Sequence, residues 1–363
     1  MGQRKFLTGL CIAGLMILWH AVLSHVQDTS RDMAMAAATM DYREEMRRLV
    51  EAISVYTKGM QPNFMIIPQN GHDLVTENGE ADGSPVSSYL RAIDGIGRED
   101  LLYGYEEDDV ATPPVVTEEI TGFLDLAERN NVQVLVTDYC STPAHMDESY
   151  RRNTASGYIS FAADHRELDH VPSYPASPYQ ENPQPIQRLT EAKNFLYLLN
   201  QDPFENRPTY FSALRSHEYD VLLIDAFFQG DILTAQEVAT LQQKSNGNRR
   251  LVVAYMSIGE AEDYRYYWQE AWTNNPPRWL EAENPQWAGN FKVRYWDPEW
   301  QAILFGNDGS YLKRILDAGF DGVYLDIIDA FEYFEEQSGI PNWGWYGGEN
   351  GNPLLRPRYP AGS

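Results

Sequence analysis

The strongest indication of the fold is the stretch Gly319-Phe-Asp-Gly-Val-Tyr-Leu-Asp-Ile-Ile-Asp329. It predicts a short buried strand, Val323 to Leu325, that ends at carboxylates. Asp326 comes directly after the apolar run, and Asp329 follows three residues later. Barrel enzymes place their catalytic groups at the C-terminal tips of buried strands. The stretch therefore predicts a barrel strand together with a candidate site.

Two further apolar runs end in the same way. They are Tyr219-Asp-Val-Leu-Leu-Ile-Asp225 and Val132-Gln-Val-Leu-Val-Thr-Asp138. Three strands that each bring an aspartate to one rim predict an acidic active site. Acid–base chemistry on a polyhydroxylated substrate is the first reaction class to expect there.

The composition limits the partners. The chain has 363 residues, enough for one large barrel or two average domains, and 43% of them are hydrophobic. A net charge of −25 argues against nucleic acid, because such a chain cannot neutralise phosphates. The 9 Trp and 23 Tyr residues are typical of carbohydrate-active proteins, although a large core also accounts for them.

The start of the chain predicts a secretory signal. Arg4 and Lys5 precede an apolar run from Phe6 to Trp19, which is short for a membrane span. We expect residues 1–25 to be a signal peptide, cleaved near Ser24, and the protein to be secreted or periplasmic. No clean Ala-x-Ala motif lies at this cleavage point, so an uncleaved N-terminal membrane anchor is the alternative. Residues 26–40 are small and polar and predict a linker.

Eight strands are expected, at 64–67, 100–105, 132–137, 157–161, 221–224, 251–256, 291–296 and 323–325. Helices are expected between most of them, at 117–129, 190–199, 234–244 and 310–318, with a last helix at 330–337. This alternation is typical of an α/β fold, the (β/α)8 TIM barrel. We assign the barrel to residues 41–345 and a tail to residues 346–363.

The order of the elements predicts a circular permutation. A helix with its cap at Asp41 and apolar residues between Met46 and Ile53 precedes the first strand. We expect this helix to be the eighth helix of the barrel and to pack beside the strand 323–325. Barrels tolerate such a rearrangement because their termini can lie close together.

Several blocks of the sequence resemble one family of extracellular barrel proteins. The blocks are Lys193-Asn-Phe-Leu-Tyr-Leu-Leu-Asn200, Tyr219 to Asp225, Ala254-Tyr-Met-Ser-Ile-Gly-Glu-Ala-Glu-Asp-Tyr-Arg265, Tyr295-Trp-Asp297 and Gly319 to Asp326. They are similar to blocks of the endo-α-1,4-polygalactosaminidases of glycoside hydrolase family 114. In that family the strand resembling Tyr219 to Asp225 comes first, whereas here other strands precede it.

The resemblance implies a secreted, endo-acting glycosidase with two catalytic carboxyls. It implies Asp326 as nucleophile and Glu99 as acid/base, in a retaining reaction on a polysaccharide that contains galactosamine. The match around Glu99 is weaker, so Asp138 is the alternative second carboxylate. Inversion also stays open, because the sequence does not give the distance between the carboxyls. The alternative function is a carbohydrate-binding barrel without catalysis.

Seven further side chains are candidates for binding a sugar. Each also has a structural interpretation, such as closing a turn, pairing with an arginine or filling the core. They are Asp225, Glu260, Asn70, Tyr255, Asp138, Trp296 and Tyr324. We expect no cofactor and no metal, because His72, His145 and His165 are scattered without His-x-x-x-His spacing. The expected partner is a polysaccharide or oligosaccharide.

Overall fold

The computed structural model describes residues 40–338. Its central strands are parallel, and their hydrogen bonds give two sheets. The first sheet has the order β1 (Met65–Pro68), β13 (Gly322–Asp326), β9 (Leu251–Ser257), β6 (Val221–Asp225) and β5 (Phe195–Leu198). The second has the order β2 (Gly95–Glu99), β3 (Gln133–Tyr139) and β4 (Ile159–Ala163).

Two isolated parallel bridges connect these sheets at both of their edges. Gln69 pairs with Gly97 between β1 and β2, and Ser160 pairs with Asn194 between β4 and β5. With these bridges included, neighbouring strands follow chain order. The order is β1 to β6, then β9, then β13, which pairs with β1. The strands are almost wholly buried, as parallel strands covered on both faces must be.

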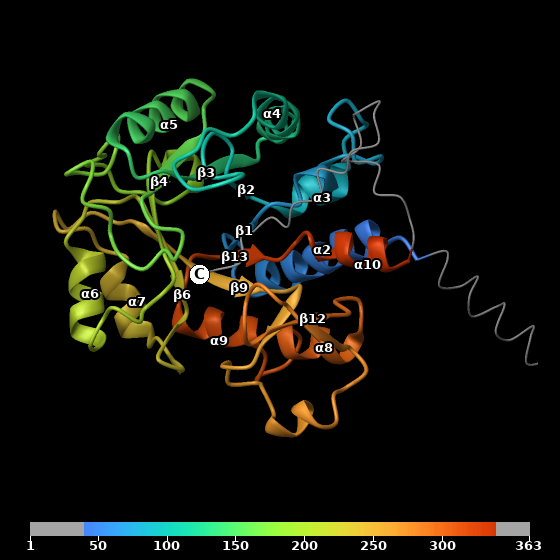
Figure 1. Ribbon diagram of the computed structural model, residues 1–363. Coiled ribbons are helices and arrows are strands. Elements are labelled where there is room, and N and C mark those ends of the chain that lie inside the picture. The colour runs from blue at the N-terminus through green and yellow to red at the C-terminus, as the bar shows by residue number, and fades with distance from the viewer. Residues whose placement is uncertain (1–39, 339–363) are drawn as a thin grey trace, which may run out of the picture.

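Helices cover the outside of the strands (Figure 1). In the described chain they are α2 (Tyr42–Met60), α3 (Ser87–Ala92), α4 (Pro114–Arg129), α5 (Pro143–Ala155), α6 (Arg207–Arg215), α7 (Ala235–Leu241), α8 (Pro298–Leu304), α9 (Tyr311–Ala318) and α10 (Ala330–Gln337). Short 3-10 turns lie at His72–Val75, Leu189–Glu191 and Glu270–Thr273. Gly319 ends α9 with a φ of 83°, a conformation in which glycine avoids steric strain. Between residues 40 and 338, no helix has the length and apolarity that a membrane crossing requires.

Three expected elements differ from the structure. The strand expected at 100–105 lies earlier, as β2, and the glycines of Gly95–Glu99 do not break it. The helix expected at 190–199 contains β5 instead, because Phe195–Leu198 is a fully buried apolar run. Such short runs do not distinguish helix from strand by periodicity.

The third difference is the strand expected at 291–296. It forms β12 (Asn290–Val293), which pairs antiparallel with β10 (Glu260–Glu262) and β11 (Leu280–Glu283). This small sheet and α8 form an excursion between β9 and α9, seen in orange in Figure 1. A two-residue hairpin, β7 (Phe227–Phe228) with β8 (Asp231–Ile232), follows β6. The described chain therefore has eight central strands, as expected. However, β5 is one of them, and the segment expected at 291–296 is not.

The opening helix lies beside the closing one, as the blue and red helices of Figure 1 show. The Arg43 guanidinium donates from Nε to Glu335 on α10 at 2.9 Å, and the Tyr42 hydroxyl lies 2.9 Å from Ser338. The strand that α2 leads into, β1, pairs with β13 along its whole length. The first and last central strands of the described chain are therefore neighbours. Circular permutation itself stays a prediction, as does the signal segment, which lies outside the described residues.

Candidate active site

A cavity of about 850 Å³ lies where the central strands end. Residues at the carboxyl ends of β2, β3, β6, β9 and β13 contribute to its wall, and so do the loops that follow β4, β5 and β9. The lining includes Gln69, Glu99, Tyr139, Arg166, Tyr197, Asp225, Phe227, Tyr255, Glu260, Glu262, Tyr264, Arg265, Trp287 and Asp326. The cavity thus occupies the position at which parallel α/β sheets bind their ligands.

Strand alternation decides which side chains reach the cavity. Successive side chains on a strand point to opposite faces. Tyr255 and Ser257, two residues apart on β9, both line the cavity. Tyr139 lines it, whereas its neighbour Asp138 points to the opposite face, toward α5. Glu99 lines it as the last residue of β2.

Asp326 ends β13 and lies on the cavity wall. Its Oδ2 accepts a hydrogen bond from the Tyr255 hydroxyl at 2.8 Å, and its Oδ1 accepts one from the Ile327 amide at 2.8 Å. Burial raises the pKa of Asp326 to about 8, and the nearby charge of Glu99 adds to the rise. The two hydrogen bonds oppose this shift without cancelling it.

Glu99 is buried, and hydrogen bonds reach both of its carboxyl oxygens. The Tyr139 hydroxyl donates to Oε1 at 2.5 Å, and the Asn70 amide donates to Oε2 at 3.3 Å. Asn70 in turn accepts hydrogen bonds from Arg98 and from the Glu99 backbone, each at 3.3 Å. These donors fix the orientation of the Glu99 carboxyl on the cavity wall.

Asp326 and Glu99 are therefore electrostatically linked across one cavity. Because the pKa of Asp326 lies near 8, the pair holds a proton at neutral pH. Two-carboxylate glycosidases begin their reaction with a proton on one of the two carboxyls.

Two further carboxylates of the cavity wall bind the guanidinium of Arg265. Its guanidinium donates to both oxygens of Asp225, at 2.9 and 2.8 Å, and to Glu262 at 2.6 Å. Asp225 also accepts a hydrogen bond from the Phe227 amide at 2.8 Å. Asp225 thus binds the loop after β6 and the loop after β10 while it lines the cavity.

Glu260 lines the cavity from β10 and is held by two donors. Lys292 lies 2.5 Å from its Oε1, and Asn284 donates to the same oxygen at 2.9 Å. The expected buried Glu–Arg pair exists as well, but it joins Glu262 to Arg265.

Four predicted site residues are absent from the cavity wall. Asn70 orients Glu99 from behind. Asp138 is fully buried, where it accepts hydrogen bonds from the Leu102 amide at 2.7 Å and from Ser149 on α5 at 2.7 Å. This placement makes Asp138 a group that fixes a helix and a loop, whereas Glu99 lies on the cavity wall together with Asp326.

The other two are Trp296 and Tyr324. Trp296 lies beyond β12 and packs on α2 and α10, with its ring centroid 4.6 Å from that of Phe334. Tyr324 is fully buried, on the same face of β13 as Asp326. Its ring centroid lies 5.3 Å from that of Tyr197. Gly97 makes room for it, because a Cβ there would meet the Tyr324 hydroxyl at 1.9 Å.

Sequence reasoning missed Tyr139, Tyr197 and Arg265 among the residues of the wall. Tyr139 could have been found, because strand alternation turns it toward the cavity once Asp138 turns away. Tyr197 was missed because its segment was expected to be helical. It donates to Gln69 at 2.9 Å across the cavity floor. Arg265 was named only as the last residue of the block Ala254 to Arg265.

The wall is acidic and aromatic. Seven carboxylate side chains and two guanidinium groups line it. Tyr264 and Trp287 line it too, and they are 58% and 44% exposed, so their rings are accessible to a ligand. Such a surface suits a polar ligand with apolar ring faces and, by its charge, a cationic one.

Comparison with known proteins gives a family for part of the chain. Residues 175–341 match the model of glycoside-hydrolase family GH114. This span contains Asp225, Glu260 and Asp326, whereas Glu99 lies before it. The match supports a glycoside hydrolase similar to that family.

Three uncharacterized proteins are similar over shorter segments. One from Thermotoga maritima is 42% identical over 149 residues, 40% of this chain and 42% of the relative. One from Deinococcus radiodurans is 40% identical over 131 residues, 36% of this chain and 40% of the relative. One from Methanocaldococcus jannaschii is 55% identical over 87 residues, 24% of each. The alignments span from about a quarter to about two fifths of these curated relatives.

Proposed function

We propose that the protein is a glycoside hydrolase in which Asp326 and Glu99 are the two catalytic carboxyls. The observation that carries this proposal is their position on one cavity wall, where burial and the charge of Glu99 raise the pKa of Asp326. The family match over residues 175–341 supports the reaction class independently.

The mechanism follows from these two groups. One carboxyl protonates the glycosidic oxygen, while the ionised one attacks the anomeric carbon or activates water. With Asp326 as nucleophile, as the resemblance implies, its proton passes to Glu99 before attack. The Tyr255 hydroxyl donates to Asp326 and the Tyr139 hydroxyl donates to Glu99. These hydrogen bonds would stabilise negative charge on either carboxylate during the reaction.

The proposed substrate is a polysaccharide that carries amino sugars and is cut within the chain. An acidic wall attracts the ammonium groups of a deacetylated polymer. The exposed rings of Tyr264 and Trp287 supply faces on which sugars can stack. Such a polymer lies outside cells, which agrees with the secretion signal proposed for residues 1–25.

We also propose that the eight parallel strands close into a circularly permuted (β/α)8 barrel. The bridges Gln69–Gly97 and Ser160–Asn194 support closure at the two points where the sheets meet. The pairing of β1 with β13 and the packing of α2 against α10 support the permutation, because they bring the first and last described elements together.

Purified protein incubated with a panel of soluble amino-sugar polymers tests the function. Release of reducing ends, lost in Asp326→Asn and in Glu99→Gln but kept in Asp138→Asn, is the expected result. Sugar binding without cleavage of any polymer would favour the non-catalytic alternative. Azide rescue of Asp326→Ala then assigns the roles, since azide replacing a nucleophile gives a glycosyl azide of inverted configuration.

A further inference from the structure

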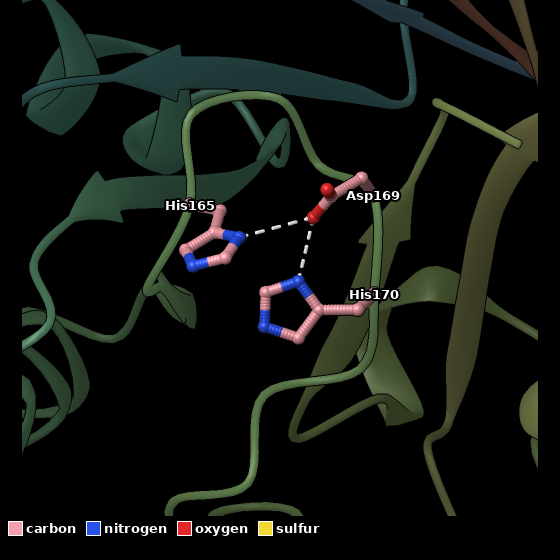
Figure 2. A group of neighbouring side chains, drawn as sticks. All are labelled: His165, Asp169 and His170. Atoms are coloured by element: carbon pink, nitrogen blue, oxygen red, sulfur yellow. Dashed lines mark hydrogen bonds and ion pairs between the residues drawn. The ribbon is translucent and has the colours of Figure 1, made fainter. Parts of the chain in front are cut away.

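Two histidines and an aspartate meet in the loop that follows β4. His165, Asp169 and His170 lie within six residues of each other in sequence, and Figure 2 shows both rings directed at the same carboxylate. The two imidazole rings are close, with centroids 4.2 Å apart. His165 therefore lies beside His170, a histidine that was not among the three considered from the sequence.

The nitrogen and oxygen atoms of this cluster converge. Nδ1 of His165 is 3.2 Å and Nδ1 of His170 is 2.6 Å from the same oxygen, Oδ1 of Asp169. The three residues each offer one ligand atom, and these atoms all lie within 4.8 Å of one another. Ligand atoms of a tetrahedral zinc ion, each at about 2.0–2.2 Å from the metal, are separated by similar distances.

A fourth residue, Asp164, contacts the ring of His170 on the side that faces away from Asp169. Its Oδ1 lies 3.1 Å from Nε2 of His170, the ring nitrogen that faces away from Asp169. When a carboxylate accepts the Nε2 proton, Nδ1 keeps its lone pair for a metal. This carboxylate–histidine–metal relay is the usual support of a metal-binding histidine.

We propose that His165, Asp169 and His170 bind a divalent transition metal, of which zinc fits best. Two imidazoles and one carboxylate are the borderline donor set that zinc accepts, and water would complete four-coordination. To admit the ion, the His170–Asp169 contact of 2.6 Å must lengthen by roughly 0.8 Å, toward the ligand spacing of a tetrahedral site. The cluster lies in a loop and is partly exposed, so an ion can reach it.

The proposed metal would stabilise the rim of the active-site cavity without taking part in chemistry. None of its three ligands lines the cavity, but the intervening residues Arg166 and Leu168 do. The Arg166 guanidinium donates to Asp100 at 3.1 Å and lies 3.9 Å from the centroid of the Tyr139 ring. Tyr139 is the donor to Glu99. A fixed loop therefore helps to fix the catalytic carboxyl.

Titration of chelator-treated, tag-free protein with Co2+, followed by displacement with Zn2+, tests the proposal. We expect the visible absorption of tetrahedral cobalt at one equivalent per chain, its loss on adding zinc, and a higher thermal midpoint with zinc. His170→Ala and Asp169→Ala should abolish the absorption. Asp164→Asn, which keeps the ligands, should weaken binding by about 10–100-fold.

The matched control is His145→Ala. His145 also bonds an aspartate through Nδ1, at 3.0 Å from Asp109, but between residues 40 and 338 no second histidine shares that carboxylate. Its loss should leave cobalt and zinc binding unchanged. The proposal is overturned if wild-type protein shows no cobalt absorption and no thermal shift. It is overturned equally if His170→Ala and Asp169→Ala bind zinc as wild type does. Neither outcome depends on whether the protein cleaves a polysaccharide.

Discussion

Replacing Asp326 by Asn should stabilise the fold while it abolishes hydrolysis. Burial and the charge of Glu99 make ionisation of Asp326 unfavourable in the folded protein, where its pKa rises from 3.8 to about 8. The folded state therefore binds more protons than the unfolded chain between these pH values. The free energy of unfolding should fall as pH rises through this window and level off above about 8.

The size of this stability change follows from the rise in the pKa of Asp326. About four pKa units at about 1.4 kcal/mol each give an upper bound of roughly 5–6 kcal/mol above pH 8. The carboxyl faces a cavity, where solvent screens part of this cost, so we expect about 2–3 kcal/mol at pH 9. An amide has no charge to bury, and its oxygen and nitrogen can still bond the Ile327 amide and the Tyr255 hydroxyl.

Urea denaturation of wild type and Asp326→Asn at pH 5, 7 and 9 measures the effect. The stability gained should be small at pH 5 and largest at pH 9. The control is Asp220→Asn, which removes a fully buried aspartate 2.5 Å from Lys244. That variant should lose about 3–5 kcal/mol, because the buried lysine is left without its counter-charge. A gain for Asp326→Asn that does not change with pH would refute the reasoning.

Four more predictions follow from the site and the chain. In wild type, kcat/KM should fall about tenfold per pH unit above pH 8, where the pair loses its last proton, whichever carboxyl is the acid. Tyr139→Phe should lower kcat by about tenfold or more, because a hydrogen bond to a charged group contributes about 1.5–3 kcal/mol; an unchanged kcat would contradict this. Gly97→Ala should cost about 1–3 kcal/mol in thermal or urea unfolding, since its methyl overlaps Tyr324; unchanged stability would show that the ring moves freely. Mass spectrometry of the secreted protein should place its N-terminus near residue 25, whereas an intact start in the cytosol would exclude the signal.

Much of the fold was predictable because strong local signals agreed with it. The capping box of α7 at Thr234 is present, and α10 occupies the expected range. The errors occurred where local signals were weak. The four-residue strand β5 carries no periodicity that separates it from a helix, and β2 contains glycines that are typical of loops.

The site was predictable only in part. Asp326 and Asp225 could be placed on the cavity, because each is the last residue of an apolar strand. Asp138 follows an apolar run as Asp225 and Asp326 do, but the alternation along β3 turns Tyr139 toward the cavity and Asp138 toward α5. The His165–His170 cluster could not be found from spacing, because the bend of the loop brings the rings together.

Hydrolysis by the matched variants is the most direct test of the proposed chemistry. Initial rates of reducing-end release from one soluble amino-sugar polymer should be compared for wild type, Asp326→Asn, Glu99→Gln and Asp138→Asn. We predict that the first two substitutions reduce the rate by several orders of magnitude while the folded structure is retained. Asp138→Asn, which alters a carboxyl outside the cavity, should keep most activity if the variant is folded. Near-wild-type rates for folded Asp326→Asn and Glu99→Gln would contradict the assignment of the catalytic pair.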